Sequence, residues 1–145
     1  MTIIQATIDH LNDLITLFDG YRIFYKQESN KQAAKDFLYK RLTKQDTIIY
    51  LAYLDNKAVG FVQLFPSFSS VSMLPTYILN DLYVEKQYRK QGIGVALLNK
   101  SKEFCRENKC KGLSLETAKN NPAQYLYESL GWKKDNYLHY FWIND

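Results

Sequence analysis

The sequence has few of the residues that build metal sites, disulfides or membrane segments. It contains two cysteines, Cys105 and Cys110, without the Cys-x-x-Cys spacing of a zinc or redox site, and its two histidines do not cluster with them. We therefore expect no metal site and two reduced thiols. No hydrophobic run approaches the roughly 20 residues that cross a membrane. Because the first residues also lack the basic start of a signal peptide, we expect a cytoplasmic protein without a membrane partner.

A strong excess of one charge is also missing. The 19 Lys and Arg residues against 15 Asp and Glu residues leave a net charge of +4, and the basic residues are scattered along the chain. The densest clusters, residues 86–90 and 109–111, are short. A nucleic-acid-binding protein usually carries a longer basic stripe. The composition therefore predicts no nucleic-acid partner.

What the sequence does contain is sufficient for one globular unit. Its 145 residues have the size of an ordinary domain, and 46% of them are hydrophobic. A chain of this length can bury a sizeable core without metals or disulfides. Because no repeat, low-complexity tract or linker divides it, we expect residues 1–145 to form a single domain.

Hydrophobic periodicity predicts four helices. Apolar residues recur at spacings of three and four in residues 11–18, and small and apolar residues follow one face of residues 93–108. Ser29-x-x-Gln32 resembles a capping box that begins a second helix. Asn121-Pro122 is a typical start for a last helix, which Gly131 ends.

Runs of β-branched and aromatic residues predict the strands between these helices. The expected strands are residues 3–6, 47–54, 59–65, 77–84, 113–117, 132–134 and 138–143. Residues 55–57, Asp-Asn-Lys, are typical of a hairpin turn, and the serine-rich segment Pro66 to Pro75 is expected to be a loop. Because hairpins and strand–helix alternation both occur, we expect an α/β fold whose mixed sheet carries helices on both faces.

Residues 81–94 carry the most informative pattern, in which a strand, a basic loop, two glycines and a helix follow one another. A helix N-terminus offers unpaired N–H groups and a partial positive charge, and glycines let a phosphate approach the backbone. Arg89 and Lys90 add cationic donors, so the pattern favours a pyrophosphate site over a simple tight turn. A Walker loop is absent, and Leu97 stands where a dinucleotide fingerprint has its third glycine.

Residues 89–94, Arg-Lys-Gln-Gly-Ile-Gly, resemble the Arg/Gln-x-x-Gly-x-Gly/Ala acetyl-CoA signature of the GNAT acetyltransferases. Residues 120–132 resemble a second segment of that family, Asn-x-x-Ala-x-x-(aromatic or Leu)-Tyr-x-x-x-Gly-Phe/Trp, at the family's spacing. The resemblance covers nearly the whole chain. It implies a mixed, mostly antiparallel sheet of six to seven strands flanked by about four helices. It also implies transfer of an acetyl group from acetyl-CoA to a primary amine.

The resemblance places acetyl-CoA along the family's fourth strand, here residues 77–84, and over the start of the helix that follows. The residues it assigns to acetyl-CoA are Leu82, Tyr83, Val84, Arg89, Lys90, Gln91, Gly92, Ile93, Gly94, Val95, Asn120 and Tyr127. Asn120 would hold the pantetheine arm, although a helix cap is an equally good interpretation of this residue.

The reaction that the resemblance implies is direct attack of a neutral amine on the thioester. The N–H group of Leu82, or of a neighbour, would stabilise the oxyanion. Tyr127 matches the general acid that protonates the leaving thiolate. Tyr125, the nearest competitor, lies on a different face of the same predicted helix.

The general base is less well defined. Asn80 stands where polyamine-acetylating relatives have a glutamate, which leaves Asp81 and Glu116 as the nearby acids. An alkylammonium group has a pKa of about 10.4 and must lose a proton before it attacks. We expect Asp81 to be functional, because a charged group inside an apolar strand needs a reason.

Within the family, the chain looks most like the branch that acetylates histones, polyamines and other small amines. The expected acceptor is a small primary amine, bound between the first two helices and the segment Pro66 to Pro75. The residues expected to contact it are Tyr25, Glu28, Phe68, Asn80, Asp81 and Glu116, with Phe24 as a further apolar wall.

The sequence leaves three alternatives to a small-amine acetyltransferase open. The acceptor could be an amine of a protein instead of a small molecule. The chain could also be a non-catalytic acyl-CoA sensor with the same fold. An unrelated nucleotide-binding module is the third alternative, but it would need the complete phosphate-binding motif that this sequence lacks. The aromatic residues near the C-terminus, including Tyr140, Phe141 and Trp142, suggest a homodimer.

Overall fold

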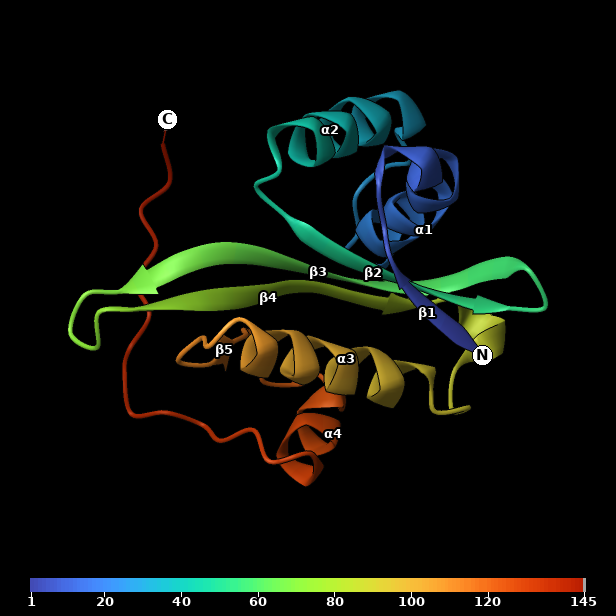
Figure 1. The fold of residues 1–145 in the computed structure, drawn as a ribbon. Helices are drawn as coiled ribbons and strands as arrows, with labels where there is room; N and C mark the ends of the chain where they lie inside the picture. The colour runs from blue at the N-terminus through green and yellow to red at the C-terminus, as the bar shows by residue number, and fades with distance from the viewer. Residues whose placement is uncertain (145) are drawn as a thin grey trace.

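A mixed sheet of five strands, in the order β1-β2-β3-β4-β5, organises the chain (Figure 1). The computed structural model describes residues 1–144. The strands are β1 (Thr2–Gln5), β2 (Ile48–Leu54), β3 (Lys57–Ser69), β4 (Leu74–Val84) and β5 (Leu113–Ser114). Strands β1 to β4 pair antiparallel, and β5 pairs parallel to β4. The expectation of six to seven strands is wrong, because residues 132–134 and 138–143 form no strand.

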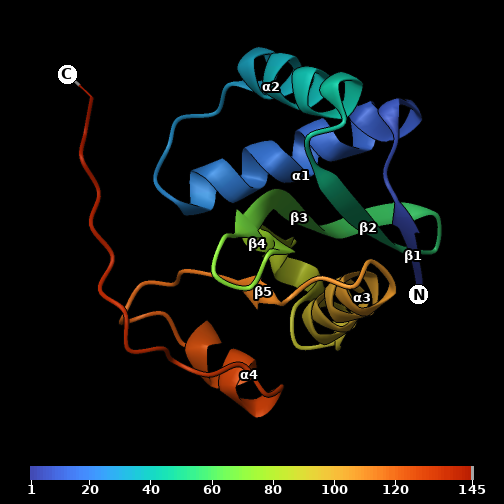
Figure 2. The same ribbon diagram turned by 60° about the vertical axis from the view of Figure 1, so that its left-hand side comes forward.

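Four helices cover the two faces of the sheet, as predicted (Figures 1 and 2). On one face lie α1 (Leu11–Phe24) and α2 (Lys31–Lys44), whereas α3 (Ile93–Glu107) and α4 (Ala123–Ser129) lie on the other. Short 3-10 turns at Ile8–His10 and Lys86–Tyr88 precede α1 and follow β4. Each face has its own buried cluster, so the sheet is packed on both sides. No helix within residues 1–144 has the length and apolar content to cross a membrane.

The start of α2 differs from the predicted capping box. Asn30 provides the cap, because its side chain accepts a hydrogen bond from the N–H of Ala33 at 3.0 Å. Ser29 instead donates its hydroxyl to the buried carboxylate of Asp19 at 2.6 Å, and the Asn30 N–H donates to the same group at 2.8 Å. Burial alone would raise the pKa of Asp19, but these two hydrogen bonds, together with the nearby charges of Lys31 and Arg22, lower it overall. Asp19 therefore fixes the end of α1 to the start of α2.

The long hairpin β3–β4 replaces the expected loop from Pro66 to Pro75. Strand β3 continues to Ser69 and β4 begins at Leu74, so only residues 70–73 connect them. Proline is tolerated at position 66 because β2 pairs with β3 only up to Leu64, which leaves this part of β3 without a neighbour on that side. The β2–β3 hairpin was predicted correctly, and its turn residues Asp55 and Asn56 both have the positive φ that tight hairpins require.

A β-bulge at Asn80 interrupts the pairing of β3 with β4. Gln63 lies opposite Asp81 and Leu64 lies opposite Leu79, so Asn80 is the extra residue on β4. A bulge of this kind bends the strand and changes which residues face each side. Strand β5 pairs with β4 only at Tyr77 and Ile78. Beyond the bulge, β4 therefore has a neighbour on one edge only.

Candidate active site

The unpaired edge of β4 presents backbone groups that no strand satisfies. The N–H of Glu85 donates to the carbonyl of Val59 on β3 at 2.9 Å. Consecutive backbone groups point to opposite edges of a strand, so the N–H groups of Leu82 and Val84 point away from β3. The carbonyl of Val84 agrees with this direction, because it accepts a hydrogen bond from the side chain of Arg89 at 2.8 Å. Leu82 thus offers a free N–H donor at the open edge.

The start of α3 offers a second set of unpaired donors. Gly92 precedes the helix with φ of 83°, a conformation that favours glycine, and no side chain caps the helix. The first intrahelical hydrogen bond runs from Ala96 N to Gly92 O at 3.0 Å. The N–H groups of residues 93–95 therefore remain unpaired and carry the positive end of the helix dipole. A Cβ atom at Gly94 would come no closer than 4.0 Å to the side chain of Leu126, so the approach to this helix start is open.

Arg89 lies between these two groups of donors. Its guanidinium carbon is 5.4 Å from the centre of the Phe24 ring and 5.6 Å from the centre of the Tyr83 ring. Together with its hydrogen bond to Val84, these contacts hold the side chain across the end of β4. Arg89 is therefore in contact with the open edge and with the last turns of α1.

Three tyrosines gather near the bulge. The hydroxyl of Tyr21 donates to the carbonyl of Asn80 at 3.3 Å, and the Tyr21 ring lies 5.0 Å from that of Tyr25. Burial, and next the nearby Asp81 carboxylate, raise the pKa of Tyr21. Burial also raises the pKa of Tyr127, with a further contribution from Tyr25, so the two hydroxyls lie close enough to influence each other. Tyr25 and Tyr127 were predicted from the sequence, whereas Tyr21 was not.

Asp81 is buried beneath this group, with only 2% of its surface exposed. Its carboxylate accepts hydrogen bonds from the side-chain amides of Gln63 and Asn80, the latter at 2.8 Å. Gln63 in turn accepts a hydrogen bond from the hydroxyl of Thr47 at 2.7 Å. Burial raises the pKa of Asp81 in spite of these bonds and of the nearby Tyr21 hydroxyl, which lower it. The charged residue predicted inside an apolar strand is thus held by a chain of polar partners.

The other residues predicted to contact the acceptor amine do not all lie near Asp81. Tyr25 is half-exposed at the end of α1, and the nearby Glu28 is exposed. Phe68 lies five residues along β3 from Gln63, or about 16 Å by the rise of a strand. Glu116 pairs with His139 at 3.1 Å on the far side of β5. The structure therefore groups Tyr25 with Asp81 and places Phe68 elsewhere, whereas Glu116 lines a cavity that it shares with Tyr127.

The short helix α4 carries two further predicted residues. Tyr127 is half-buried, and its ring centre lies 6.2 Å from that of Trp132. Tyr125 is 70% exposed, so the two tyrosines do point to different environments. The side chain of Asn121 accepts a hydrogen bond from the N–H of Ala123 at 2.9 Å. Asn121 rather than Asn120 therefore satisfies the start of α4.

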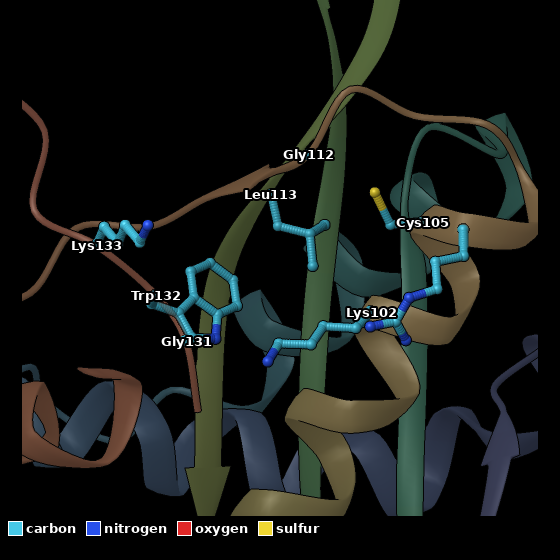
Figure 3. Close-up of a pocket in the computed structure, with 8 residues that line it drawn as sticks. Lys102, Cys105, Gly112, Leu113, Gly131, Trp132 and Lys133 are labelled. Carbon is cyan, nitrogen blue, oxygen red and sulfur yellow. The ribbon is translucent and has the colours of Figure 1, made fainter. Parts of the chain in front are cut away.

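Two cavities lie beside β5. The smaller, of about 410 Å³, lies between the C-terminal half of α3, β5 and residues 131–133; Figure 3 shows its lining side chains, including Lys102, Leu113 and Trp132. The larger, of about 990 Å³, extends along residues 113–119 and 133–139 and includes Tyr127. No group of three or more metal-ligating side chains occurs in the part of the chain that the structure describes.

Comparisons with known proteins agree on one family. The model of the acetyltransferase (GNAT) family matches residues 11–132. The uncharacterised N-acetyltransferase YhfO of Bacillus subtilis is 41% identical over 97% of this chain and 95% of its own length. A probable acetyltransferase of Haemophilus influenzae is 33% identical over 92% and 90%. The crystal structure of a probable acetyltransferase superimposes with a TM-score of 0.95 at 40% identity, covering 100% of this chain and 99% of that one.

Proposed function

The chain belongs to the GNAT family of acetyltransferases, and from this premise we propose that it transfers the acetyl group of acetyl-CoA to a primary amine of a small molecule. The proposal rests on one observation, which is that two groups of unpaired hydrogen-bond donors lie next to each other. The free backbone of β4 beyond the bulge is followed, within ten residues, by the uncapped start of α3. One extended ligand with amide and phosphate groups can use both sets.

The residues present suit acetyl-CoA. In the proposed complex the pantetheine arm pairs with the backbone of Leu82 to Val84, as an added strand would. The pyrophosphate accepts hydrogen bonds from the N–H groups of residues 93–95, where Gly92 and Gly94 keep the approach open. Lys90 and Gln91 flank it, and Arg89 is placed to exchange the Val84 carbonyl for a phosphate. Asn120, which is not needed to begin α4, is available to the pantetheine.

The proposed reaction forms a bond between the amine nitrogen and the acetyl carbon and breaks the bond from that carbon to sulfur. The N–H of Leu82 stabilises the negative charge on the acetyl oxygen, a type of contact that contributes about 3 kcal/mol in other enzymes. Tyr127 gives its hydroxyl proton to the departing thiolate. Its raised pKa keeps that proton in place throughout the neutral range.

In the proposed reaction, Asp81 acts on the acceptor amine. Because solvent hardly reaches the carboxylate, we assign its action to the Tyr21 hydroxyl, which is coupled to Asp81 and borders the bulge. The Asp81 carboxylate attracts the ammonium form of the acceptor. The proton that the amine loses passes to the Tyr21 oxygen, while the Tyr21 hydroxyl proton leaves the Asn80 carbonyl and passes to the Asp81 carboxylate. Asn80 presents an amide at the position where the polyamine-acetylating branch has its glutamate, so aminoalkyl compounds and amino acids are as suitable as polyamines.

The acceptor would lie beside the end of α1, with Tyr25 as an apolar wall and Glu28 at the rim. Phe68 lies too far along β3 to contribute to the same pocket in one chain, whereas Glu116 lines the same cavity as Tyr127. We retain two further proposals from the sequence, a cytoplasmic location and a homodimeric state.

Thermal unfolding with different ligands tests the cofactor. Saturating acetyl-CoA should raise the melting temperature, whereas ATP and NAD should leave it unchanged. Equal stabilisation by all three would contradict the proposal. Release of thiol from acetyl-CoA across a library of small amines, amino acids and basic peptides then tests the acceptor. Turnover with peptides alone would refute the small-amine assignment but would leave acetyl transfer standing.

A further inference from the structure

A row of buried polar side chains crosses three strands on the face of the sheet that α1 and α2 cover. Thr47 directly precedes β2, Gln63 lies on β3 and Asp81 lies on β4, and none of them is more than 8% exposed. Gln63 lies opposite Asp81 on one side and opposite Ile49, two residues after Thr47, on the other. Side chains two apart on a strand share a face, so the three form one row. Polar groups buried in this way must find partners, because each costs free energy without one.

The hydroxyl of Thr47 determines which way the Gln63 amide points. It has one proton and two acceptors within reach, Gln63 Oε1 at 2.7 Å and the carbonyl of Leu64 at 3.4 Å. The shorter contact is the stronger hydrogen bond, so the proton is donated to Gln63. With Oε1 bound to Thr47, the other end of the amide, Nε2, faces the Asp81 carboxylate and donates to it.

The orientation of this amide decides which form of Asp81 is satisfied. An ionised carboxylate only accepts hydrogen bonds, so it requires the N–H end of the amide, whereas a protonated carboxyl can donate to the oxygen end. The last torsion of a glutamine side chain is broad and roughly two-fold, so the torsion itself selects neither end. The Thr47 hydroxyl therefore makes the selection, and it selects the end that suits the carboxylate.

We propose that Thr47 and Gln63 are positioning residues, which keep Asp81 in its carboxylate form by holding an N–H donor toward it. The inference rests on the proposed function, in which Asp81 attracts the ammonium group and takes up a proton. Both tasks require the carboxylate, although burial disfavours it. Asn80 and the Tyr21 hydroxyl also support the carboxylate, but Asn80 is exposed and Tyr21 passes protons in the proposed reaction. Gln63 is the buried donor that stays in place throughout.

The titratable groups nearest to Asp81 are tyrosines. Tyr21 on α1 is close to the carboxylate, and Tyr25 on the same helix and Tyr127 on α4 lie near Tyr21. A phenol has an ordinary pKa of about 10, and burial raises the pKa of Tyr21 and of Tyr127 further. None of these groups changes charge between pH 4.5 and pH 8, so a titration over this range reports on Asp81 itself.

NMR titration of the labelled carboxyl carbon of Asp81 tests the proposal without reference to activity. Thr47→Val removes the hydroxyl but keeps the shape of the side chain, and it should raise the pKa of Asp81. Gln63→Met removes the donor and should raise this pKa further, whereas Thr47→Ser keeps the hydroxyl and should restore the parent pKa. Thr43→Val is the matched control, because it removes a hydroxyl that donates to the carbonyl of Tyr39 on α2 at 2.8 Å. An Asp81 pKa that is unchanged in Thr47→Val, or raised equally in Thr43→Val, would overturn the proposal.

The pH dependence of kcat/KM separates this inference from the proposed function. A base acts only in its ionised form, so Thr47→Val should move the acidic limb of the profile to higher pH for any small amine that the library identifies as an acceptor. Below that limb kcat/KM should be about fivefold lower than in the parent protein, which is the typical contribution of one hydrogen bond. The affinity for acetyl-CoA should not change, because Thr47 lies two strands away from β4. If the carboxyl titration moved and the rate profile did not, Asp81 would be held as inferred here but would not act on the amine.

Discussion

The two halves of β4 belong to one strand but have different surroundings. From Leu74 to Ile78 the strand has β3 on one edge and β5 close to the other, and the N–H of Tyr77 donates to Gly112 at 3.2 Å. From Leu79 to Val84 it has β3 alone. The bulge at Asn80 separates the two halves. The first half has strand neighbours on both edges, whereas the second half exposes backbone groups with which a ligand can form hydrogen bonds.

This difference shows how a sheet can supply a binding site without dedicated side chains. Unpaired backbone groups at a sheet edge are usually an aggregation hazard. Here Arg89, the rings of Phe24 and Tyr83, and the start of α3 surround the open half and leave room for one extended molecule. Changes to the open half or its partners should therefore alter function, and matched changes in the paired half, or at an equivalent residue, are the controls.

The largest effect is expected from Tyr127, the proposed acid beside the open half. Tyr127→Phe should lower kcat by about 10²- to 10⁴-fold, because general-acid catalysis typically contributes that much. The affinity for acetyl-CoA and the melting temperature should hardly change, since the ring still packs against Trp132. Tyr125→Phe, on the exposed side of α4, should retain full activity. A decrease of less than threefold for Tyr127→Phe, with chemistry rate-limiting, would exclude this residue as the acid.

The next effect concerns a single backbone N–H. Replacing Leu82 by the corresponding α-hydroxy acid converts its N–H to an ester oxygen and should lower kcat by about 10²- to 10³-fold, as expected for one oxyanion donor. Stability should change little, because this N–H has no partner in the sheet. The same replacement at Tyr77 removes a sheet hydrogen bond, so it should cost about 1 kcal/mol of stability and leave kcat unchanged. If the replacement at Leu82 lowered stability and the replacement at Tyr77 lowered kcat, the division of β4 into an open half and a paired half would be wrong.

A smaller effect is expected at the start of α3. Gly94→Glu places a carboxylate where the phosphates are proposed to bind, and it should weaken acetyl-CoA binding by at least about tenfold, or 1.4 kcal/mol. The backbone at this position is not strained, and the nearest side-chain atom to an added Cβ is 4.0 Å away, so the fold should tolerate the change. Gly112→Glu adds the same charge in open space beside β5. Calorimetric titration that gave equal losses for both variants would argue against the phosphate site.

The smallest effect is a pH dependence of stability from Asp81, the first residue after the bulge. Since burial raises its pKa, the folded protein holds this proton more tightly than the unfolded chain. The contribution of Asp81 to stability is therefore complete below the ordinary pKa of 3.8 and is lost as the pH rises through the raised value. Asp81→Asn should have its least favourable melting temperature, relative to the parent protein, at the acidic end of a series from pH 8 to pH 4.5. A difference that is constant across the series would show that Asp81 does not titrate in this way.

Short sequence patterns correctly predicted the parts of the structure that depend on residues close together in the sequence. The glycine-led start of α3, the turn at Asp55 and Asn56, and the helix that carries Tyr127 all followed from short segments. Tyr21 could have been found in the same manner, since it continues the apolar stripe of α1 that residues 11–18 begin. It is in fact both packed against the core and bonded to Asn80.

Features that depend on distant residues were not predicted. The bulge at Asn80 arises from the register between β3 and β4, which no single segment determines. Ser29 does not cap α2 because Asp19, ten positions earlier, takes its hydroxyl. Residues 138–143 have the composition of a strand but form none, and a strand requires a partner edge that lies outside the segment itself.

Hydrogen exchange of individual amides, followed by NMR with and without acetyl-CoA, tests the central claim most directly. In the free protein the N–H groups of Leu82 and Val84 should exchange quickly, whereas that of Tyr83, which points to β3, should be protected. Saturating acetyl-CoA should slow exchange at Leu82, Val84 and residues 93–95 and leave Tyr77 unchanged. If the ligand protected none of these amides, or protected the two halves of β4 equally, acetyl-CoA would not bind along the open edge.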